Sequence, residues 1–415
     1  MGCSRAGNAA PRGPRDFWQT RERIEREPMS RKNLLRSREG HTRVTYVELF
    51  FDLVFVFAIT QLSHTLLEHL TLVGAFQTLF LLLAVWWVWM YTCWFTNWID
   101  PEKPSVRMMM FALMLAGLLL SASTPNAFGH EGLLFAAAYS FMQVVRTAFL
   151  LHALHRRDPA NFTNMRRAIV WLIVSAVFWI AGGCAAGERR VLLWLVALAI
   201  EYLGPVAYFY VPGLGRSSTS DWKVDGAHMA ERCALFVIIA LGESILVTGA
   251  TAASLPATAS ATCAFLVAFV GSVAMWWIYF NIGAERGSRE FAGAADPGRV
   301  ARNVYTYFHI PIIAGIVVCA VADEITIAHP IGHLTPGATA ALLGGPALYL
   351  AGNIYFKRAS AKYYPLSHLV GLGLLAIVAM ISPSFEHVTP LALGLATTLI
   401  LVIVAVWETL SFRKI

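Results

Sequence analysis

The segment LVGAFQTLFLLLAVWWVWMYTCWFT, residues 72–96, carries no charged side chain and decides the class of the fold. A helix that crosses about 30 Å of hydrocarbon needs about 20 mostly apolar residues, so this segment is long enough to span a membrane. The rest of the chain is similar, because 57% of its 415 residues are hydrophobic and only 14% are charged. A soluble domain has about 25% charged residues. The sequence therefore predicts an all-α, polytopic membrane protein and excludes soluble, disordered and disulfide-scaffold classes.

Windows of the same kind recur along the chain and predict about 12 transmembrane helices. We expect them at residues 46–66, 72–96, 108–126, 132–154, 168–186, 191–212, 229–251, 259–282, 303–323, 337–356, 364–384 and 388–411. The connections are short, so the helices are expected to pack as one bundle. A more polar loop falls between the sixth and seventh windows. The predicted organisation is a first six-helix half over 46–212, a cytoplasmic linker over 213–228 and a second half over 229–415.

The positions of the basic residues predict the orientation. With the N-terminus in the cytoplasm, 28 of the 32 Lys and Arg residues lie in inner segments. The outer loops hold Arg189 and Arg190, and the predicted spans hold Arg146 and Arg232. Because basic loops stay in the cytoplasm, both termini are expected there and the number of spans is even. The net charge of +7 is thus interpreted as a topology signal, and no nucleic-acid partner is expected.

Residues 1–45 form a basic tail with 11 Lys or Arg and 5 Asp or Glu. We expect this tail to be cytoplasmic and partly disordered. Besides the bilayer itself, the partner that its charge favours is an anionic lipid surface. It contains no apolar h-region of a signal peptide, and Met29 is an alternative start. The six cysteines show no CxxC or CxxH spacing, so no metal site, cofactor or disulfide is expected.

The two predicted halves resemble each other weakly. LVFVFAITQ, residues 53–61, aligns with LFVIIALGE, residues 235–243, and a polar residue ends each run. Six spans per half would give a 6+6 repeat whose halves have the same orientation and are related by an axis along the membrane normal. Such a repeat would favour a pathway between the halves. Chance similarity between apolar helices is the alternative.

Ionisable side chains within the spans are the candidate functional residues, because each costs about 2.5–3.5 kcal/mol at mid-helix on insertion scales. Glu48 and Asp52 lie four residues apart in the first span, so both carboxylates share one helix face. They are expected either to bind a proton or cation or to form a structural ion pair. The depth of Arg146 in the fourth span predicts that it neutralises one of these two carboxylates.

The seventh span supplies Glu231 and Arg232 near its cytoplasmic start and Glu243 deeper in the membrane. Gly242 and Ser244 flank Glu243. Small neighbours let a second helix approach closely while the carboxylate faces a cavity or a partner. We therefore expect Glu243 to be the principal functional acid.

Two further spans carry polar candidates. Glu201, near the middle of the sixth span, precedes a Gly-Pro pair where a kink would expose backbone groups, so lining a cavity and simple burial are both open. His309 in the ninth span is either part of a proton relay or a hydrogen-bonded packing residue. Water or lipid headgroups would solvate three acids at span ends, Asp323, Glu324 and Glu408. No P-loop, GxGxxG, HExxH or GxSxG motif is present, so no catalytic residue is named.

Two segments resemble those of a known family. ELFFDLVFVFAITQL, residues 48–62, is similar to the opening signature of the bacterial low-temperature-requirement A (LtrA) family, and HMAERCALFVIIALGES, residues 228–244, to its second signature. One departure is Ala234, where that family often has Gly. The resemblance implies an integral protein of the bacterial cytoplasmic (inner) membrane that is linked to growth in the cold. It also implies that five residues matter: Glu48, Asp52, Glu231, Arg232 and Glu243.

The sequence leaves three functional hypotheses. The first is a transporter or channel for a small solute or ion, with proton coupling as one variant. The second is a membrane-embedded enzyme acting on a lipid or isoprenoid, which predicts acid, His and Arg groups clustered beside a lateral opening. The third is a non-transporting scaffold or sensor, which predicts that all buried charges pair off and that no continuous cavity exists. The candidate pathway residues are Glu48, Asp52, Arg146, Glu201, Glu231, Arg232, Glu243 and His309.

Overall fold

The computed structural model describes residues 33–36, 43–219, 222–281, 291, 293, 295–361, 364–384 and 387–412. Most of the tail predicted at 1–45 lies outside this part of the chain, and so do five basic residues used for the orientation: Arg286, Arg289, Lys362, Arg413 and Lys414. Contacts divide the chain into Met1–Leu34 and Leu35–Ile415, and the description below concerns the second unit.

The described part of the second unit is built from helices, with two isolated bridges and no strand. The helices are α2 (Tyr46–Glu68), α3 (Leu72–Trp98), α4 (Pro104–Ser123), α5 (Gly132–Leu154), α6 (Pro159–Cys184), α7 (Gly187–Val206), α8 (Gly226–Ser254), α9 (Ala259–Tyr279), α11 (Pro297–Val300), the π-helical η4 (Ala301–Tyr307), α12 (Ile310–Ala328), α13 (Pro336–Ala361), α14 (Leu366–Ile381) and α15 (Pro390–Phe412). Short 3-10 turns follow α4 and α14, at Thr124–Asn126 and Ser382–Ser384. Because α11, η4 and α12 form one run, the predicted all-α fold with about 12 helices is confirmed.

Nine helices in the described residues are long and apolar enough to cross a membrane. The helix α14, with 16 residues, is shorter, and α7 and α13 are not among the nine. Nevertheless, α7 runs antiparallel to α6 along its length. The Trp194 indole donates to the Trp179 carbonyl at 3.0 Å, and the Ser175 hydroxyl donates to the Ala197 carbonyl at 3.0 Å. The helix α7, with 20 residues, therefore lies beside the C-terminal part of α6, which has 26.

The helices α2 and α8 lie side by side and run in the same direction. Glu48 bonds His228, 180 residues further along the chain, and Thr60 bonds Glu243, 183 residues further along. The difference in residue number between bonded residues is nearly constant along the two helices. Such a constant difference means that they are parallel, because in an antiparallel pair it would change steadily. Because both helices start on the same side, the chain must cross the bundle an even number of times between the start of α2 and the start of α8. The five helices α2–α6 are therefore not enough, and α7 supplies the sixth crossing.

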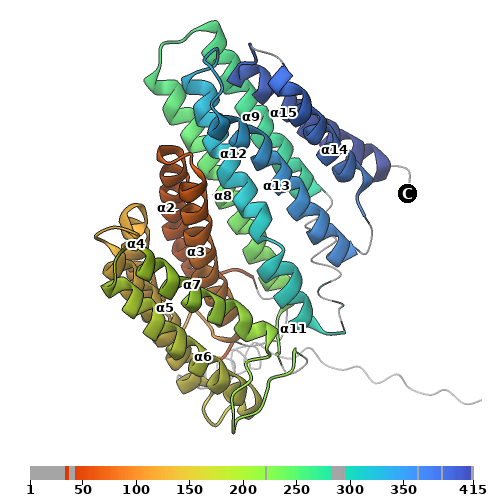
Figure 1. The fold of residues 1–415 in the computed structure, drawn as a ribbon. Coiled ribbons are helices and arrows are strands. Elements are labelled where there is room, and N and C mark those ends of the chain that lie inside the picture. The colour runs from red at the N-terminus through yellow and green to blue at the C-terminus, as the bar shows by residue number, and fades with distance from the viewer. Residues whose placement is uncertain are drawn as a thin grey trace, which may run out of the picture. The chain divides into compact units, whose positions relative to one another are not determined.

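The helices α2 and α3 lie between two groups of helices, with α4–α7 on one side and α8, α9 and α12–α15 on the other (Figure 1). They contact α4 and α5 in the first group and α8 and α12 in the second. This arrangement makes the faces of α2 and α3 the junction of the bundle. The boundaries of the two predicted halves, and the 6+6 repeat, stay predictions.

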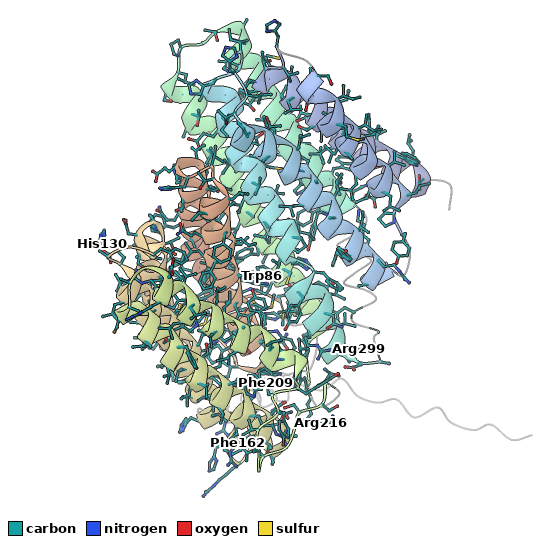
Figure 2. The ribbon with its side chains drawn as sticks, viewed as in Figure 1. Trp86, His130, Phe162, Phe209, Arg216 and Arg299 are labelled. Carbon is teal, nitrogen blue, oxygen red and sulfur yellow. The ribbon has the colours of Figure 1, made fainter. Side chains whose placement is uncertain are left out.

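Trp86 marks the centre of this junction (Figure 2). Its buried indole donates to the Thr306 carbonyl at 2.8 Å, so the only polar atom of the side chain is satisfied. Its ring meets Phe236 edge-on at 5.3 Å between centroids and stacks on His309 at 6.3 Å. The large aromatic side chains of α3 thus connect α8 with the π-helical segment η4.

Candidate functional site

The helices α2 and α8 begin with matching polar caps that fix charged side chains at their first turns. Thr45 precedes α2, where the Glu48 carboxylate accepts the Thr45 backbone N–H at 2.8 Å and the Thr45 hydroxyl accepts the Glu48 N–H, which forms a capping box. Asp225 caps α8 by accepting the backbone N–H groups of Ala227 and His228, each at 3.1 Å. Glu48 and His228 are therefore held at the starts of two adjacent parallel helices.

Five side chains form the α2–α8 charge cluster. Four of them, Glu48, Asp52, His228 and Arg232, lie near the starts of α2 and α8, and Arg36 comes from the segment before α2. Glu48 Oε1 lies 2.8 Å from His228 Nε2 and 3.2 Å from Arg232 Nη1, and Glu48 Oε2 lies 3.1 Å from Arg36 Nη2. Asp52 Oδ1 accepts Arg232 Nη2 at 2.6 Å, and it also accepts the indole N–H of Trp89 at 2.8 Å. All five side chains are buried.

The neighbours of His228 define its protonation in this arrangement. Asn97 Oδ1 accepts the Asp225 backbone N–H at 2.9 Å, so the Asn97 amide nitrogen is the end that lies 3.2 Å from His228 Nδ1. That nitrogen can only donate, and His228 Nδ1 must therefore accept. The Nε2–H group then donates to Glu48, and the imidazole is neutral. Two carboxylates and two guanidiniums leave the cluster with no net charge. This arrangement fits the alternative in which Glu48 and Asp52 form structural ion pairs.

The predicted pairing of Arg146 with Glu48 or Asp52 is wrong. Arg146 Nη1 instead donates to the Val88 carbonyl at 3.2 Å and to Thr92 Oγ1 at 3.0 Å, and Nη2 donates to Gln143. Depth along the membrane gives the level of a residue but not the direction in which it points. The helix α5 packs mainly against α3, α4 and α6, whereas α8 lies directly beside α2, so Arg232 takes both carboxylates.

Glu201 is simply buried, and it lines none of the three cavities described for this chain. Its carboxylate accepts four side-chain donors, at 2.6 Å from Ser175, 2.7 Å from Tyr139, 2.5 Å from Gln143 and 3.1 Å from Trp179. Through Gln143 it is linked to Arg146, so α5, α6 and α7 share one hydrogen-bond network.

Replacing Glu201 by glutamine is expected to destabilise the protein by about 1–3 kcal/mol, because an amide –NH2 then faces donors that need an acceptor. The measurement is the thermal unfolding midpoint of the purified chain in detergent. Glu188→Gln is the matched control, since Glu188 lies on the same helix and is exposed. Equal midpoints for both variants would contradict a structural role for this network.

His309 and Glu231 are separated from the α2–α8 charge cluster. His309 Nδ1 lies 3.0 Å from the Val304 carbonyl, to which it donates, and Nε2 accepts the Tyr279 hydroxyl at 2.8 Å. Both ring nitrogens are therefore satisfied in buried packing, as the packing alternative for this residue describes. Glu231 is exposed, although Arg232 beside it is buried, because successive residues of a helix point in different directions.

Glu243 lies at the other end of the α2–α8 contact and has few partners. Its side chain is buried, and its Oε2 accepts the Thr60 hydroxyl. Its Oε1 has no partner among the described residues, and the same holds for the buried hydroxyls of Ser63, Ser244 and Thr248. The α2–α8 charge cluster also has buried atoms without a hydrogen-bond partner, among them Asp52 Oδ2 and Arg232 Nε, but its carboxylates are paired with cations, whereas Glu243 has no ion pair among the described residues.

A family model for the bacterial low temperature requirement A protein (LtrA) matches residues 43–406. The chain belongs to the LtrA family. A similar curated protein, an uncharacterized protein of Rhizobium meliloti (strain 1021), is 41% identical over 382 residues, which cover 92% of this chain and 93% of the relative. No solved structure matches. With its several apolar helices, this LtrA protein is a membrane protein whose matched region contains every candidate residue named above.

The LtrA chain also buries an ion pair that sequence reasoning missed. Lys357 Nζ lies 2.6 and 2.7 Å from the two carboxylate oxygens of Glu408 and 3.2 Å from His368 Nε2. The interpretation of Glu408 as a solvated acid at a span end is therefore wrong, as is the placement of Lys357 in a loop. The helix α13 continues to Ala361, beyond its predicted end, and carries Lys357 into the packing. The sequence signal for this ion pair was the position of two opposite charges, Lys357 and Glu408, near the ends of two predicted spans.

Asp323 likewise lies inside a helix, because α12 extends to Ala328. It lines a cavity of about 30 Å³ together with the side chains of Thr326, Thr397 and Thr398, between α9, α12, α13 and α15. The described residues give it no ion pair. In the same part of the chain, no group of three His, Cys, Asp or Glu side chains is placed to hold a metal ion.

Proposed function

We propose that this LtrA-family protein is a transporter or channel that moves a small solute or ion across the bacterial inner membrane, with Glu243 carrying the coupled proton. Both termini are assigned to the cytoplasm on the distribution of basic residues. The observation that carries the proposal is the buried Glu243 carboxylate, which accepts one hydroxyl and forms no ion pair among the described residues. A buried carboxylate without a cation is costly in its charged form, so it takes up a proton or a cation.

Buried charges without an ion pair favour this proposal over a scaffold. A scaffold predicts that all buried charges pair off, as they do in the α2–α8 charge cluster and between Lys357 and Glu408. Glu243 does not follow that rule, and neither do Glu201 and Arg146, which have only neutral hydrogen-bond partners among the described residues. The α2–α8 contact thus has ion pairs at its Glu48 end and a single hydroxyl bond, from Thr60, at its Glu243 end. The second end is where the two helices separate with the least loss of hydrogen bonds.

The enzyme alternative has less support. It predicts acid, His and Arg groups beside an opening, and the α2–α8 charge cluster has that composition. However, its groups bond one another in ion pairs and hydrogen bonds. A substrate would have to break these ion pairs in order to reach the side chains.

The test is proton flux into proteoliposomes across an imposed pH gradient, followed with a pH-sensitive dye inside the vesicles. We expect the native chain to carry protons and Glu243→Gln to fall to the level of empty vesicles, because an amide cannot exchange a proton in this range. Glu231→Gln is the matched control, since it makes the same change at an exposed position of the same helix. Equal flux in the native chain and Glu243→Gln, or no flux in either, would count against the proposal.

A further inference from the structure

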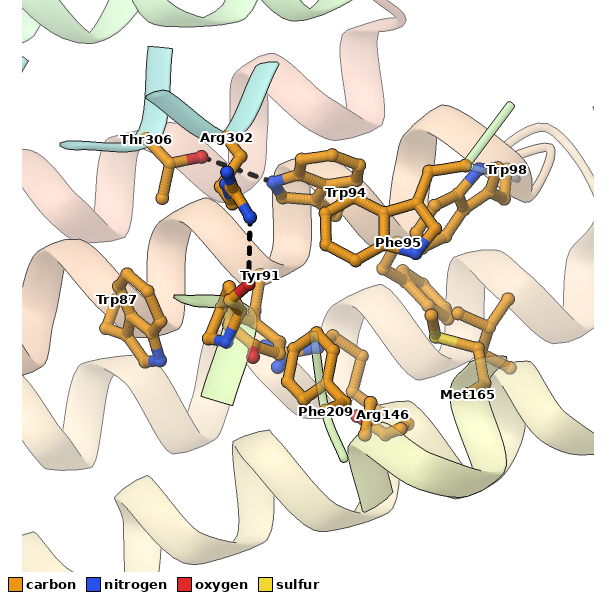
Figure 3. A pocket seen from close by; sticks show the side chains of 15 residues that line it. Trp87, Tyr91, Trp94, Phe95, Trp98, Arg146, Met165, Phe209, Arg302 and Thr306 are labelled. Carbon is orange, nitrogen blue, oxygen red and sulfur yellow. Dashed lines mark hydrogen bonds between the residues drawn. The ribbon is translucent and has the colours of Figure 1, made fainter. Parts of the chain in front are cut away.

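The largest set of unused aromatic and basic side chains surrounds a cavity between α3, α5, α6, the segment after α7 and η4 (Figure 3). Its enclosed part has a volume of about 60 Å³, and it continues into open space at its mouth. Seven of its 15 lining residues are aromatic, two are arginines and none is acidic. Neither the α2–α8 charge cluster nor Glu243 contributes to it.

Arg146 reaches this cavity as a buried cation without an anion. Its side chain belongs to a residue that is 1% exposed, and no described carboxylate lies within ion-pair distance. Three of its five N–H groups donate to the neutral acceptors Val88, Thr92 and Gln143, which leaves two without an acceptor. Glu201 is connected to it only through Gln143. A buried charge with only neutral partners is costly, so a bound anion would stabilise it.

Arg302 brings a second cation to the same cavity from η4. Its Nε donates to Asn303 and its Nη1 to the Pro205 carbonyl, each at 3.0 Å, so three of its N–H groups have no acceptor among the described residues. No described carboxylate pairs with it. The helix carrying Arg302 is π-helical over Ala301–Tyr307, and π-helical segments are frequent at functional sites.

Three further polar atoms on the cavity walls have no partner. The indole nitrogens of Trp87 and Trp222 and the hydroxyl of Tyr91 are buried, and no described group bonds them. All three side chains line the cavity. More than about 90% of buried polar groups in native proteins have a partner, so these three atoms mark a polar lining that the described residues leave unsatisfied.

We propose that this cavity binds a small monocarboxylate, whose carboxylate takes the free N–H groups of Arg146 and Arg302 and whose apolar body lies against the aromatic walls. The planar guanidinium matches a carboxylate in geometry. The enclosed volume fits a head group of that size, and the mainly apolar walls disfavour a multiply charged anion such as phosphate. Its role as the transported solute rests on the function proposed above, whereas binding itself does not.

The test is a titration of the purified full chain in detergent with benzoate, followed by tryptophan fluorescence, because four lining residues are tryptophans. We expect saturable quenching by benzoate and none by benzyl alcohol, which has a similar body and no charge. Arg302→Gln should weaken benzoate binding about tenfold, the loss of roughly one charge-assisted hydrogen bond. Arg302→Lys, which keeps the charge without the planar fork, should weaken it less. The control is Arg299→Gln, an exposed arginine on α11 that pairs with Asp296 and leaves affinity unchanged.

Four results would overturn the site. The first is an equal fluorescence response to benzoate and benzyl alcohol, and the second is unchanged benzoate affinity in both Arg302 variants when their melting temperatures are native. The third is displacement of benzoate by an equal concentration of inorganic phosphate. The fourth is tighter binding of decanoate than of benzoate. Flux of labelled benzoate separates this inference from the proposed function. Saturable binding without flux supports the site and counts against transport of this ligand. Glu243-dependent proton flux without benzoate binding counts against the site alone.

Discussion

Arg232→Ala is expected to destabilise the protein by about 3–5 kcal/mol, a large share of the 5–15 kcal/mol that keeps a typical protein folded. Arg232 is fully buried and lies between the carboxylates of Glu48 and Asp52, at 3.2 and 2.6 Å. Removing its guanidinium leaves two carboxylates close together, with Arg36 alone to balance them. The loss falls where α2 meets α8, which is a contact between the central pair of helices and the second group.

The measurement is the thermal unfolding midpoint of the purified chain, with the yield of folded protein in the membrane as a second readout. Glu231→Ala is the control, because it truncates the exposed neighbour on the same turn of α8. A triple variant with Arg232→Met, Glu48→Gln and Asp52→Asn tests the cause. It removes the charges together and should recover part of the lost stability, since an apolar or neutral replacement of a whole buried pair is often tolerated. An Arg232→Ala midpoint equal to that of Glu231→Ala would contradict the assignment.

The helices could be predicted from the sequence because hydropathy and length decide which segments enter the membrane. The run 72–96 became α3 (Leu72–Trp98) with ends displaced by no more than two residues. The observed helix ends differ more from the predicted ends where a charged residue stands close to an apolar run. Asp323 was assigned to a span end and Lys357 to the loop after a span, and both lie within continuing helices. A helix continues past a charge when that charge finds a partner or a polar cavity, and this depends on other helices.

The candidate site could be predicted only in part for the same reason. Glu48, Asp52 and Arg232 were selected as costly charges in the membrane, and the structure brings them together. The partner of the acids was assigned wrongly, because a sequence gives the depth of Arg146 but not the helices beside α5. The cavity beside η4 needed the whole fold. Its tryptophans on α3 stand in an apolar run that also fits simple packing, and nothing in the sequence places Arg302 beside them.

Gly315→Ala is expected to force α12 and α13 apart, although alanine is a small residue. A Cβ atom at position 315 would lie 2.5 Å from the backbone nitrogen and 2.8 Å from the Cα of Tyr349. Main-chain atoms cannot rotate away as the end of a side chain can, so the helices must move. Small residues allow membrane helices such close contact, and overpacking one typically costs about 1–3 kcal/mol.

Gly344→Ala makes the same chemical change on α13 with the opposite expected sign. Nothing lies within 4 Å of a Cβ atom built at this position. Alanine there should raise stability by up to about 1 kcal/mol, because glycine is the poorer helix former. Thermal unfolding midpoints of the two variants, measured in the same detergent, should therefore shift in opposite directions from the native value. A rise in both would mean that α12 and α13 are not in backbone contact. That result would also contradict the close packing that places α12, which carries Asp323, against α13.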